Sequence, residues 1–215
     1  MNRHLIIYLF ALLAPMALLT SCSESDGDPE EFANWKKTND DYFNNLYATA
    51  KSSASLGDKR WKVIRQWSLE ESAAKDPYDH IVVNVLENGT GSGCPLYTDS
   101  VKVHYEGRLL PSTSYPEGYV FDKSFTGEYS PATSTPAKFG VSGVVDGLST
   151  ALQHMHIGDR WKVYIPYQLA YGTTNNGTIP AYSTLVFDVT LVSYYRAGVD
   201  VPDSKARKAA GWVEE

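Results

Sequence analysis

Three segments of the chain, at 101–109, 160–166 and 184–192, alternate apolar and polar side chains over seven to nine positions. A period of two residues is that of a strand with one buried and one exposed face. Residues 80–93, HIVVNVLENGTGSG, are typical of a fourth strand that enters a glycine-rich turn. Four such strands facing one core favour an antiparallel sheet. The positions expected to face inward are Val101, Val103, Tyr105, Trp161, Val163, Ile165, Leu185, Phe187, Val189 and Leu191.

One segment inside this series has the period of a helix. In VVDGLSTALQHM, 144–155, the residues Leu148, Ala151, Leu152 and Met155 follow the steps 0, 3, 4 and 7 of a single helical face. Asp146 is expected to be the N-cap of this helix. The sequence therefore predicts an α+β fold in which a curled antiparallel sheet of about five strands wraps over one short helix.

The first 21 residues have the pattern of an export leader. An uncharged apolar run, 5–19, is too short for a typical membrane-spanning helix and ends in LTSC at 19–22. This ending resembles the bacterial lipobox, in which cleavage before the cysteine exposes it for lipid attachment. We predict a lipoprotein signal peptide over 1–21 and lipidation of Cys22. The alternative is an ordinary secreted protein with a chance cysteine.

An acidic segment at 22–31 follows the leader and predicts a flexible tether. Its acidic residues resemble the signal that sends lipoproteins of the Bacteroidetes type to the cell's outer face, and the alternative is a plain soluble spacer. We expect a protein anchored by lipid to the bacterial outer membrane, on its periplasmic or its cell-surface face.

Residues 32–78 are predicted to form a helical extension, because apolar residues within 31–52 recur at three- and four-residue steps. This amphipathic helix has two interpretations, which are packing on the main domain or the seam of a homodimer. The main domain is predicted over 79–196, and a charged C-terminal tail over 197–215.

Charge and composition exclude several functions. The net charge of −6 and the pI near 5.4 argue against nucleic acid as a partner. Cys94 is the one cysteine left beside Cys22, and we interpret it as a small buried hydrophobe. His154 and His156 would point in different directions on a helix, so we predict no metal site. We also expect no cofactor, since the sequence contains no glycine-rich phosphate loop.

The order of motifs over 79–196 resembles the FKBP-type peptidyl-prolyl cis-trans isomerases. The resemblance is carried by six motifs in the family's order and near its spacing: VHYEGRL, FDKSF, VVDGL, ALQHMHIGD, YIPYQLAYG and IPAYSTLVFDVTL. It implies an FKBP-like fold and an apolar cup that receives a proline ring.

The resemblance also implies the site residues. The catalytic positions correspond to Asp122, Tyr171 and Ile179. The Ile179 backbone N–H would receive the substrate carbonyl, the Tyr171 hydroxyl would be a second donor, and Asp122 would orient Tyr105. The substrate-binding positions correspond to Tyr105, Phe121, Phe139, Val144, Val145, Leu148 and Phe187.

The sequence departs from the family's pattern at three places. Leu148 stands where the family commonly has tryptophan, Ala137 stands where many members have phenylalanine, and the segment 109–122 is longer than usual. Macrolide ligands of the tacrolimus and rapamycin class are therefore expected to bind with reduced affinity.

The sequence thus predicts a prolyl isomerase that assists the folding of exported proteins and binds their Xaa-Pro segments. The alternative is a non-catalytic module on the same fold, which binds proline-containing peptides or acts as a chaperone.

Overall fold

The computed structural model describes residues 30–130, 134–198 and 212–213. The helices and strands below lie in the unit Glu31–Glu215. The predicted leader, Cys22, nearly all of the predicted tether and most of the predicted tail lie outside the described residues. Within those residues, no helix has both the length and the apolar character needed to cross a membrane.

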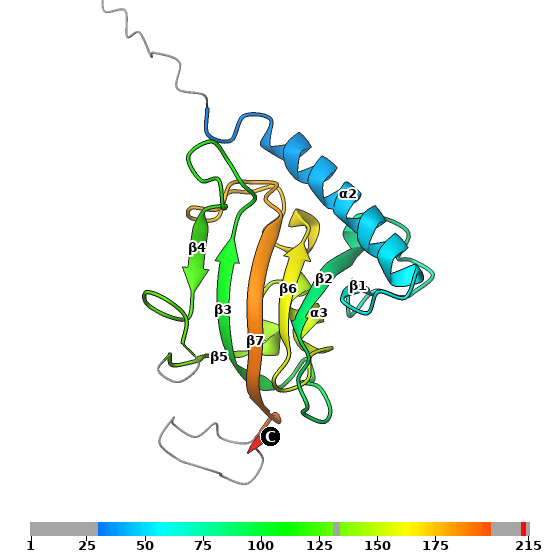
Figure 1. The fold of residues 1–215 in the computed structure, drawn as a ribbon, viewed down its shortest axis with the longest axis vertical. Helices are drawn as coiled ribbons and strands as arrows, with labels where there is room; N and C mark the ends of the chain where they lie inside the picture. The colour runs from blue at the N-terminus through cyan, green and yellow to red at the C-terminus, as the bar shows by residue number, and fades with distance from the viewer. Residues whose placement is uncertain (1–29, 131–133, 199–211, 214–215) are drawn as a thin grey trace, which may run out of the picture. The chain divides into compact units, whose positions relative to one another are not determined.

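An antiparallel sheet runs through the described structure (Figure 1). Its spatial order is β1-β2-β6-β7-β3-β4, while β5 also pairs with β3 and β8 pairs with β7. The predicted fold class is confirmed, but eight strands are present in the described residues where about five were expected. The short strands β4, β5 and β8 contain too few residues to give a periodic signal. The strands are β1 (Trp61–Arg65), β2 (His80–Glu87), β3 (Ser100–Arg108), β4 (Val120–Lys123), β5 (Ala137–Gly140), β6 (Arg160–Ile165), β7 (Leu185–Tyr195) and β8 (Trp212–Val213).

The long strands bury the faces that their sequences predict. Every second residue of β6 and of β7 up to Leu191 is buried, including Trp161 and Val189. Strand β3 differs in two respects. Tyr105 on its inner face is only partly buried, and His104 on its other face is buried, with 6% exposed. The ring of Tyr129 covers it, with 5.0 Å between the ring centroids. A loop residue thus buries a position that strand alternation alone would leave exposed.

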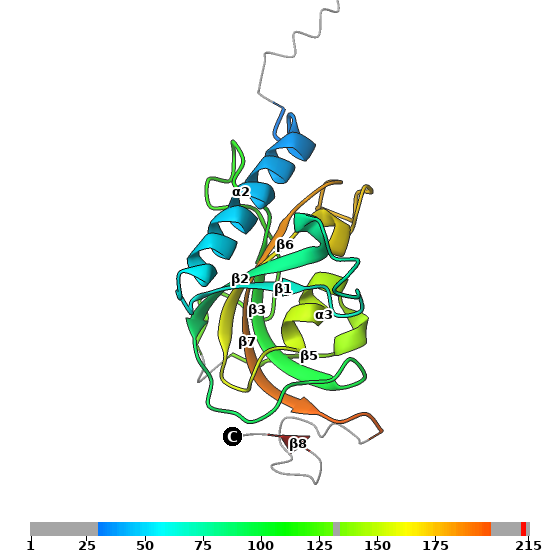
Figure 2. The ribbon, with the colours of Figure 1, turned by 90° about the vertical axis from the view of Figure 1, so that its right-hand side faces the viewer.

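A short helix, α3 (Asp146–Leu152), packs on the inner face of the curled sheet (Figure 2). The close approach of α3 to β6 depends on Gly147, because an added Cβ there would lie 2.2 Å from a side-chain carbon of Ile165. The N-cap prediction was wrong by one residue, because Val145 is the N-cap and Asp146 is the first helical residue. A carboxylate in the first turn is still favourably placed relative to the helix dipole.

A longer helix, α2 (Trp35–Ser55), packs on the opposite face of β2 (Figure 2). Phe43 and Ala50 of α2 form a cluster with Val82, whereas Ile81 and Val83 point into the main core. Of the apolar positions within 31–52, Trp35, Phe43 and Ala50 are buried within this chain and Tyr42 is exposed, which favours the packing interpretation. The predicted helical extension over 32–78 also contains a strand, because β1 pairs with β2 along its whole length.

Three 3₁₀ turns complete the described elements: η1 (Pro77–Asp79), η2 (Val141–Gly143) and η3 (Tyr167–Leu169).

Candidate functional site

One cavity brings together all ten residues predicted for the site. The cavity, hereafter the cup, has a volume of about 680 Å³ and opens between the ends of β3, β4 and β5, the start of α3 and the loop before β7. Its lining includes the predicted set Tyr105, Phe121, Asp122, Phe139, Val144, Val145, Leu148, Tyr171, Ile179 and Phe187. Their placement around one hollow fits a binding site, while their individual roles stay predictions.

Four further residues line the cup without having been predicted, and they are Gly143, Asn176, Gly177 and Thr178. The Asn-Gly pair at 176–177 is a turn signal, which by itself does not indicate a binding site. The turn in fact brings this loop to the rim of the cup.

The bottom of the cup is a set of aromatic rings packed edge to face. The ring of Phe187 is 6% exposed and lies 5.5 Å from the ring of Phe121 at an interplanar angle of 83°. Tyr105 lies 6.2 Å from Phe187 and 6.1 Å from Phe139, between centroids. Gly107 makes this packing possible, because an added Cβ there would lie 2.5 Å from the Phe121 ring. The result is an apolar surface of closely packed rings at the bottom of the cup.

Leu148 supplies the floor from the first turn of α3. Its side chain is 4% exposed and belongs to the same core cluster as Phe187. A leucine keeps the floor apolar but offers no N–H group and less flat surface than an indole. Val144 and Val145 are partly buried at the rim beside it.

The polar groups of the cup lie on its walls. The Tyr105 hydroxyl donates a hydrogen bond to Asp122, with 2.6 Å between the oxygens. Burial, together with this hydrogen bond, raises the pKa of Tyr105, so the phenol remains a donor at neutral pH. Tyr171 is 40% exposed, and among the described residues its hydroxyl has no hydrogen-bond partner. One wall therefore carries a hydrogen-bonded donor–acceptor pair, and the other carries the free hydroxyl of Tyr171.

The backbone N–H of Ile179 has an acceptor within the protein. It donates to the carbonyl oxygen of Asn176 at 2.9 Å, and the N–H of Asn176 donates back to the Ile179 carbonyl at 2.9 Å. Gly177, between them, has a φ of 56° in the left-handed region. The N–H that the family resemblance assigns to the substrate carbonyl is thus engaged in a tight turn. A substrate would have to share it or replace Asn176.

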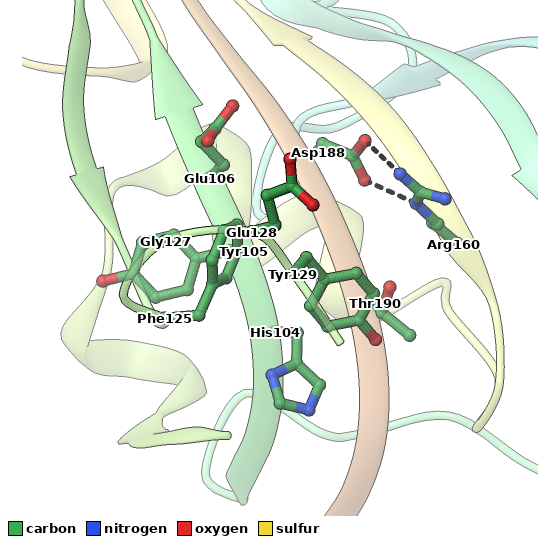
Figure 3. Close-up of a pocket in the computed structure, with 10 residues that line it drawn as sticks. All are labelled: His104, Tyr105, Glu106, Phe125, Gly127, Glu128, Tyr129, Arg160, Asp188 and Thr190. Atoms are coloured by element: carbon green, nitrogen blue, oxygen red, sulfur yellow. Dashed lines mark hydrogen bonds and ion pairs between the residues drawn. The ribbon is translucent and has the colours of Figure 1, made fainter. Parts of the chain in front are cut away.

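A second cavity, of about 310 Å³, is lined by polar and aromatic residues on the other face of the sheet (Figure 3). His104 and Asp188 line it, and both alternate along their strands with residues that face the core. Arg160 donates to both carboxylate oxygens of Asp188, at 2.9 Å each. Because this cavity is smaller than the cup and its arginine is already paired, the cup is the better candidate site.

His156 lies between Cys94 and Asp159, an arrangement that resembles a cysteine nucleophile with its histidine base and a carboxylate. The Cys94 sulfur is 3.9 Å from Nε2 of His156, and Nδ1 of His156 is 3.7 Å from Asp159. Burial raises the pKa of the half-buried Cys94 thiol, which is the opposite of activation. Within the described ranges, no group of three or more His, Cys, Asp and Glu side chains is placed to hold a metal ion.

Comparison with known proteins relates this geometry to a family. The model of the FKBP-type peptidyl-prolyl cis-trans isomerases matches residues 94–192, a range that includes all ten predicted cup residues. Residues 94–192 are an FKBP-type isomerase domain.

Relatives of the FKBP-type domain occur in several bacteria. The FKBP-type 22 kDa peptidyl-prolyl cis-trans isomerase of Escherichia coli strain K12 is 40% identical over 129 residues, which are 58% of this chain and 56% of that protein. Outer membrane protein MIP of Legionella longbeachae is 36% identical over 114 residues, which are 53% of this chain and 43% of that protein. The chain thus spans about half the length of these relatives.

A solved structure has a similar fold. The crystal structure of a peptidyl-prolyl cis-trans isomerase from Pseudomonas syringae pv. tomato is 26% identical and covers 79% of this chain and 100% of its own, with a TM-score of 0.52. The likeness therefore extends beyond the FKBP-type domain into the elements that precede residue 94.

Proposed function

We propose that the protein is a peptidyl-prolyl cis-trans isomerase that acts on Xaa-Pro bonds of exported polypeptides. The observation that carries the proposal is the cup, in which apolar rings surround the Tyr105–Asp122 pair inside an FKBP-type domain. The reaction makes and breaks no covalent bond, so it requires neither a nucleophile nor a metal.

Rotation about an Xaa-Pro bond must break amide resonance, at a barrier of about 18–20 kcal/mol. Water stabilises the planar amide because that form is charge-separated. A proline ring placed on Phe187 and Leu148 leaves that water behind, which favours the twisted amide. Each ~1.36 kcal/mol removed from the barrier accelerates the rotation about tenfold, so a modest effect of this kind suffices.

The donors at the rim complete the proposed mechanism. As the amide twists, its carbonyl oxygen turns away from its planar position and needs a hydrogen-bond donor there. The Tyr171 hydroxyl is free to donate, and the Ile179 N–H can donate if it leaves or shares the Asn176 carbonyl. Asp122 fixes the Tyr105 hydroxyl and adds negative potential to the wall beside the twisting bond.

A protease-coupled isomerase assay on residues 23–215 tests the proposal, with a proline-containing tetrapeptide as substrate. We expect acceleration over a heat-denatured sample, and inhibition of that acceleration by tacrolimus. Binding of the peptide without acceleration would reject the enzyme and favour the non-catalytic peptide-binding module.

The proposed location is the bacterial outer membrane, with lipid attached at Cys22. The support is the lipobox-like LTSC at 19–22, together with a Legionella relative that is named an outer membrane protein. Replacing Cys22→Ala should move the protein from the membrane fraction to the soluble fraction. Protease treatment of intact cells then separates a cell-surface position from a periplasmic one, and retention of the variant on membranes would exclude lipid at Cys22 as the anchor.

A further inference from the structure

Helix α2 reaches the rim of the cup through buried hydrogen bonds. The indole Nε1–H of Trp35 donates to the Ser183 hydroxyl oxygen at 2.8 Å, and that hydroxyl donates to the Pro180 carbonyl at 2.7 Å. Trp35 is 7% exposed and Ser183 3% exposed, so both bonds are shielded from water. Since Pro180 follows Ile179, the first residue of α2 is two hydrogen bonds away from a wall of the cup.

Asn39, one helical turn further on, makes a second connection. Its Oδ1 accepts a hydrogen bond from the backbone N–H of Thr184 at 2.7 Å, and its Nδ2 donates to the Trp35 carbonyl at 2.7 Å. Asn39 is fully buried, and leaving such an amide unpaired would be costly. The side chain therefore ties the start of α2 to the residue just before β7.

The loop that carries these contacts includes a strained residue. The flap segment, residues 172–184, has little regular structure and contains Tyr182 with a φ of 64°, a strained conformation for a bulky residue. The Tyr182 ring packs on Tyr167 at 5.2 Å, and the ammonium of Lys36 on α2 lies 5.7 and 5.9 Å from the two ring centroids. Residues of α2 thus contact the flap segment at and beside its strained position.

We propose that Trp35 and Asn39 are positioning residues of the isomerase, which hold the flap segment so that Ile179 closes the cup over the proline. The inference rests on the proposed function of the cup. Both residues lie before the FKBP-type domain at 94–192, so the family match does not include them. A displaced wall matters because catalytic geometry is sensitive to shifts of about 1 Å, which can cost a hundredfold in rate.

Two variants of the full chain without its leader test the proposal. Asn39→Ala removes the acceptor for the Thr184 N–H. Trp35→Phe removes the indole N–H together with one of the two fused rings and keeps an aromatic side chain. We expect each to lower kcat/KM by about tenfold, a barrier increase that a loosened wall can produce.

Amide hydrogen exchange of Thr184 and Ile179 supplies a readout that does not depend on activity. We expect faster exchange at both amides in Asn39→Ala. The matched control is Phe43→Leu, which weakens the packing of the same helix on Val82 and leaves the hydrogen bonds of Trp35 and Asn39 to the flap segment in place. It should lower the stability and leave kcat/KM and both amides near the wild-type values.

Two results would overturn the proposal. One is a wild-type kcat/KM in Asn39→Ala although the Thr184 amide exchanges faster, since the flap segment would then be released without consequence. The other is an equal loss of kcat/KM in Phe43→Leu, which would point to general destabilisation. If the wild-type protein shows no isomerase activity, the proposed function fails. In that case, the affinity for a proline-containing tetrapeptide tests the positioning role. Asn39→Ala must lower this affinity, and Phe43→Leu must leave it unchanged.

Discussion

The Tyr105 hydroxyl and the Asp122 carboxyl group are hydrogen-bonded at 2.6 Å across the wall of the cup, joining β3 to β4. Tyr105 also contacts the rings of Phe139 and Phe187, so this bond holds an aromatic face of the binding surface in one orientation. Asp122 itself is exposed. Its surroundings therefore suit a role in the site better than a role in the core.

We expect Asp122→Leu to lower kcat/KM by about tenfold or more, through the loss of a preorganised polar group beside the twisting amide. The melting temperature should stay close to that of the wild type, because an exposed carboxyl group contributes little to stability. The isomerase assay and a thermal melt measure the two effects. Full activity in Asp122→Leu would remove Asp122 from the mechanism, and Tyr105→Phe is the companion variant for the other half of the pair.

Two substitutions at Tyr171 separate the contribution of its hydroxyl from that of its ring. Tyr171→Ala should lower kcat/KM by removing a wall of the cup. Tyr171→Phe keeps the ring and should lower kcat/KM less, by about threefold to tenfold, since it removes a single hydrogen bond worth about 0.5–1.5 kcal/mol. Steady-state kinetics of both variants decide the point. Equal activity of Tyr171→Phe and the wild type would show that the hydroxyl is not a donor to the substrate.

Replacing Leu148→Trp should strengthen the binding of tacrolimus by about 1 kcal/mol, if the larger ring forms a flat contact with the ligand. Leu148 is 4% exposed, so a poorly accommodated indole would instead strain the first turn of α3. Isothermal titration calorimetry measures the affinity, and a thermal melt reports overpacking. Unchanged or weaker binding by a stable variant would mean that the floor has a different shape from that of the family's common members.

The buried imidazole of His104 predicts a pH dependence of stability. Burial lowers the pKa of His104 in the folded state from its ordinary value of 6.5. The unfolded chain therefore binds the proton more readily than the folded chain. The contribution of neutral His104 to the free energy of unfolding is fully present above about pH 6.5, and it is lost as the pH falls through the folded-state pKa.

His104→Phe keeps a ring beside Tyr129 and cannot titrate. Between pH 7.5 and pH 5, the free energy of unfolding of the wild type should fall further than that of the variant. Urea denaturation at both pH values measures the free energy of unfolding of each protein. The effects of the other histidines cancel in the comparison, because both proteins contain them. Parallel decreases in the two proteins would show that His104 does not contribute to the acid sensitivity.

The parts of the fold with regular periods could be predicted from the sequence. β6, and β7 up to Leu191, alternate because one face packs on the core, and α3 shows a helical face because it packs on the sheet. β1 differs from these strands in the structure, because all five of its residues are partly buried and its two faces show no contrast in burial.

The cup residues were predicted by motif resemblance, since they come from six separate segments that no local period connects. Two features of the site gave no sequence signal. The pairing of the Ile179 N–H with Asn176 depends on how a polar turn folds back on itself. The contact of Asn39 with Thr184 joins residues 145 positions apart, and asparagine in a helix usually predicts an exposed or capping position.

Strand β2 ends seven residues before the FKBP-type domain begins at residue 94, yet it forms a ladder with β6 over most of the length of that strand. A fragment trimmed to 94–192 would leave the N–H and C=O groups along that side of β6 without partners and would uncover Val163 and Ile165, which Ile81 and Val83 help to bury. Open strand edges of this kind invite pairing between molecules. The smallest soluble form of this isomerase domain should therefore begin upstream of β1, and shorter fragments should aggregate.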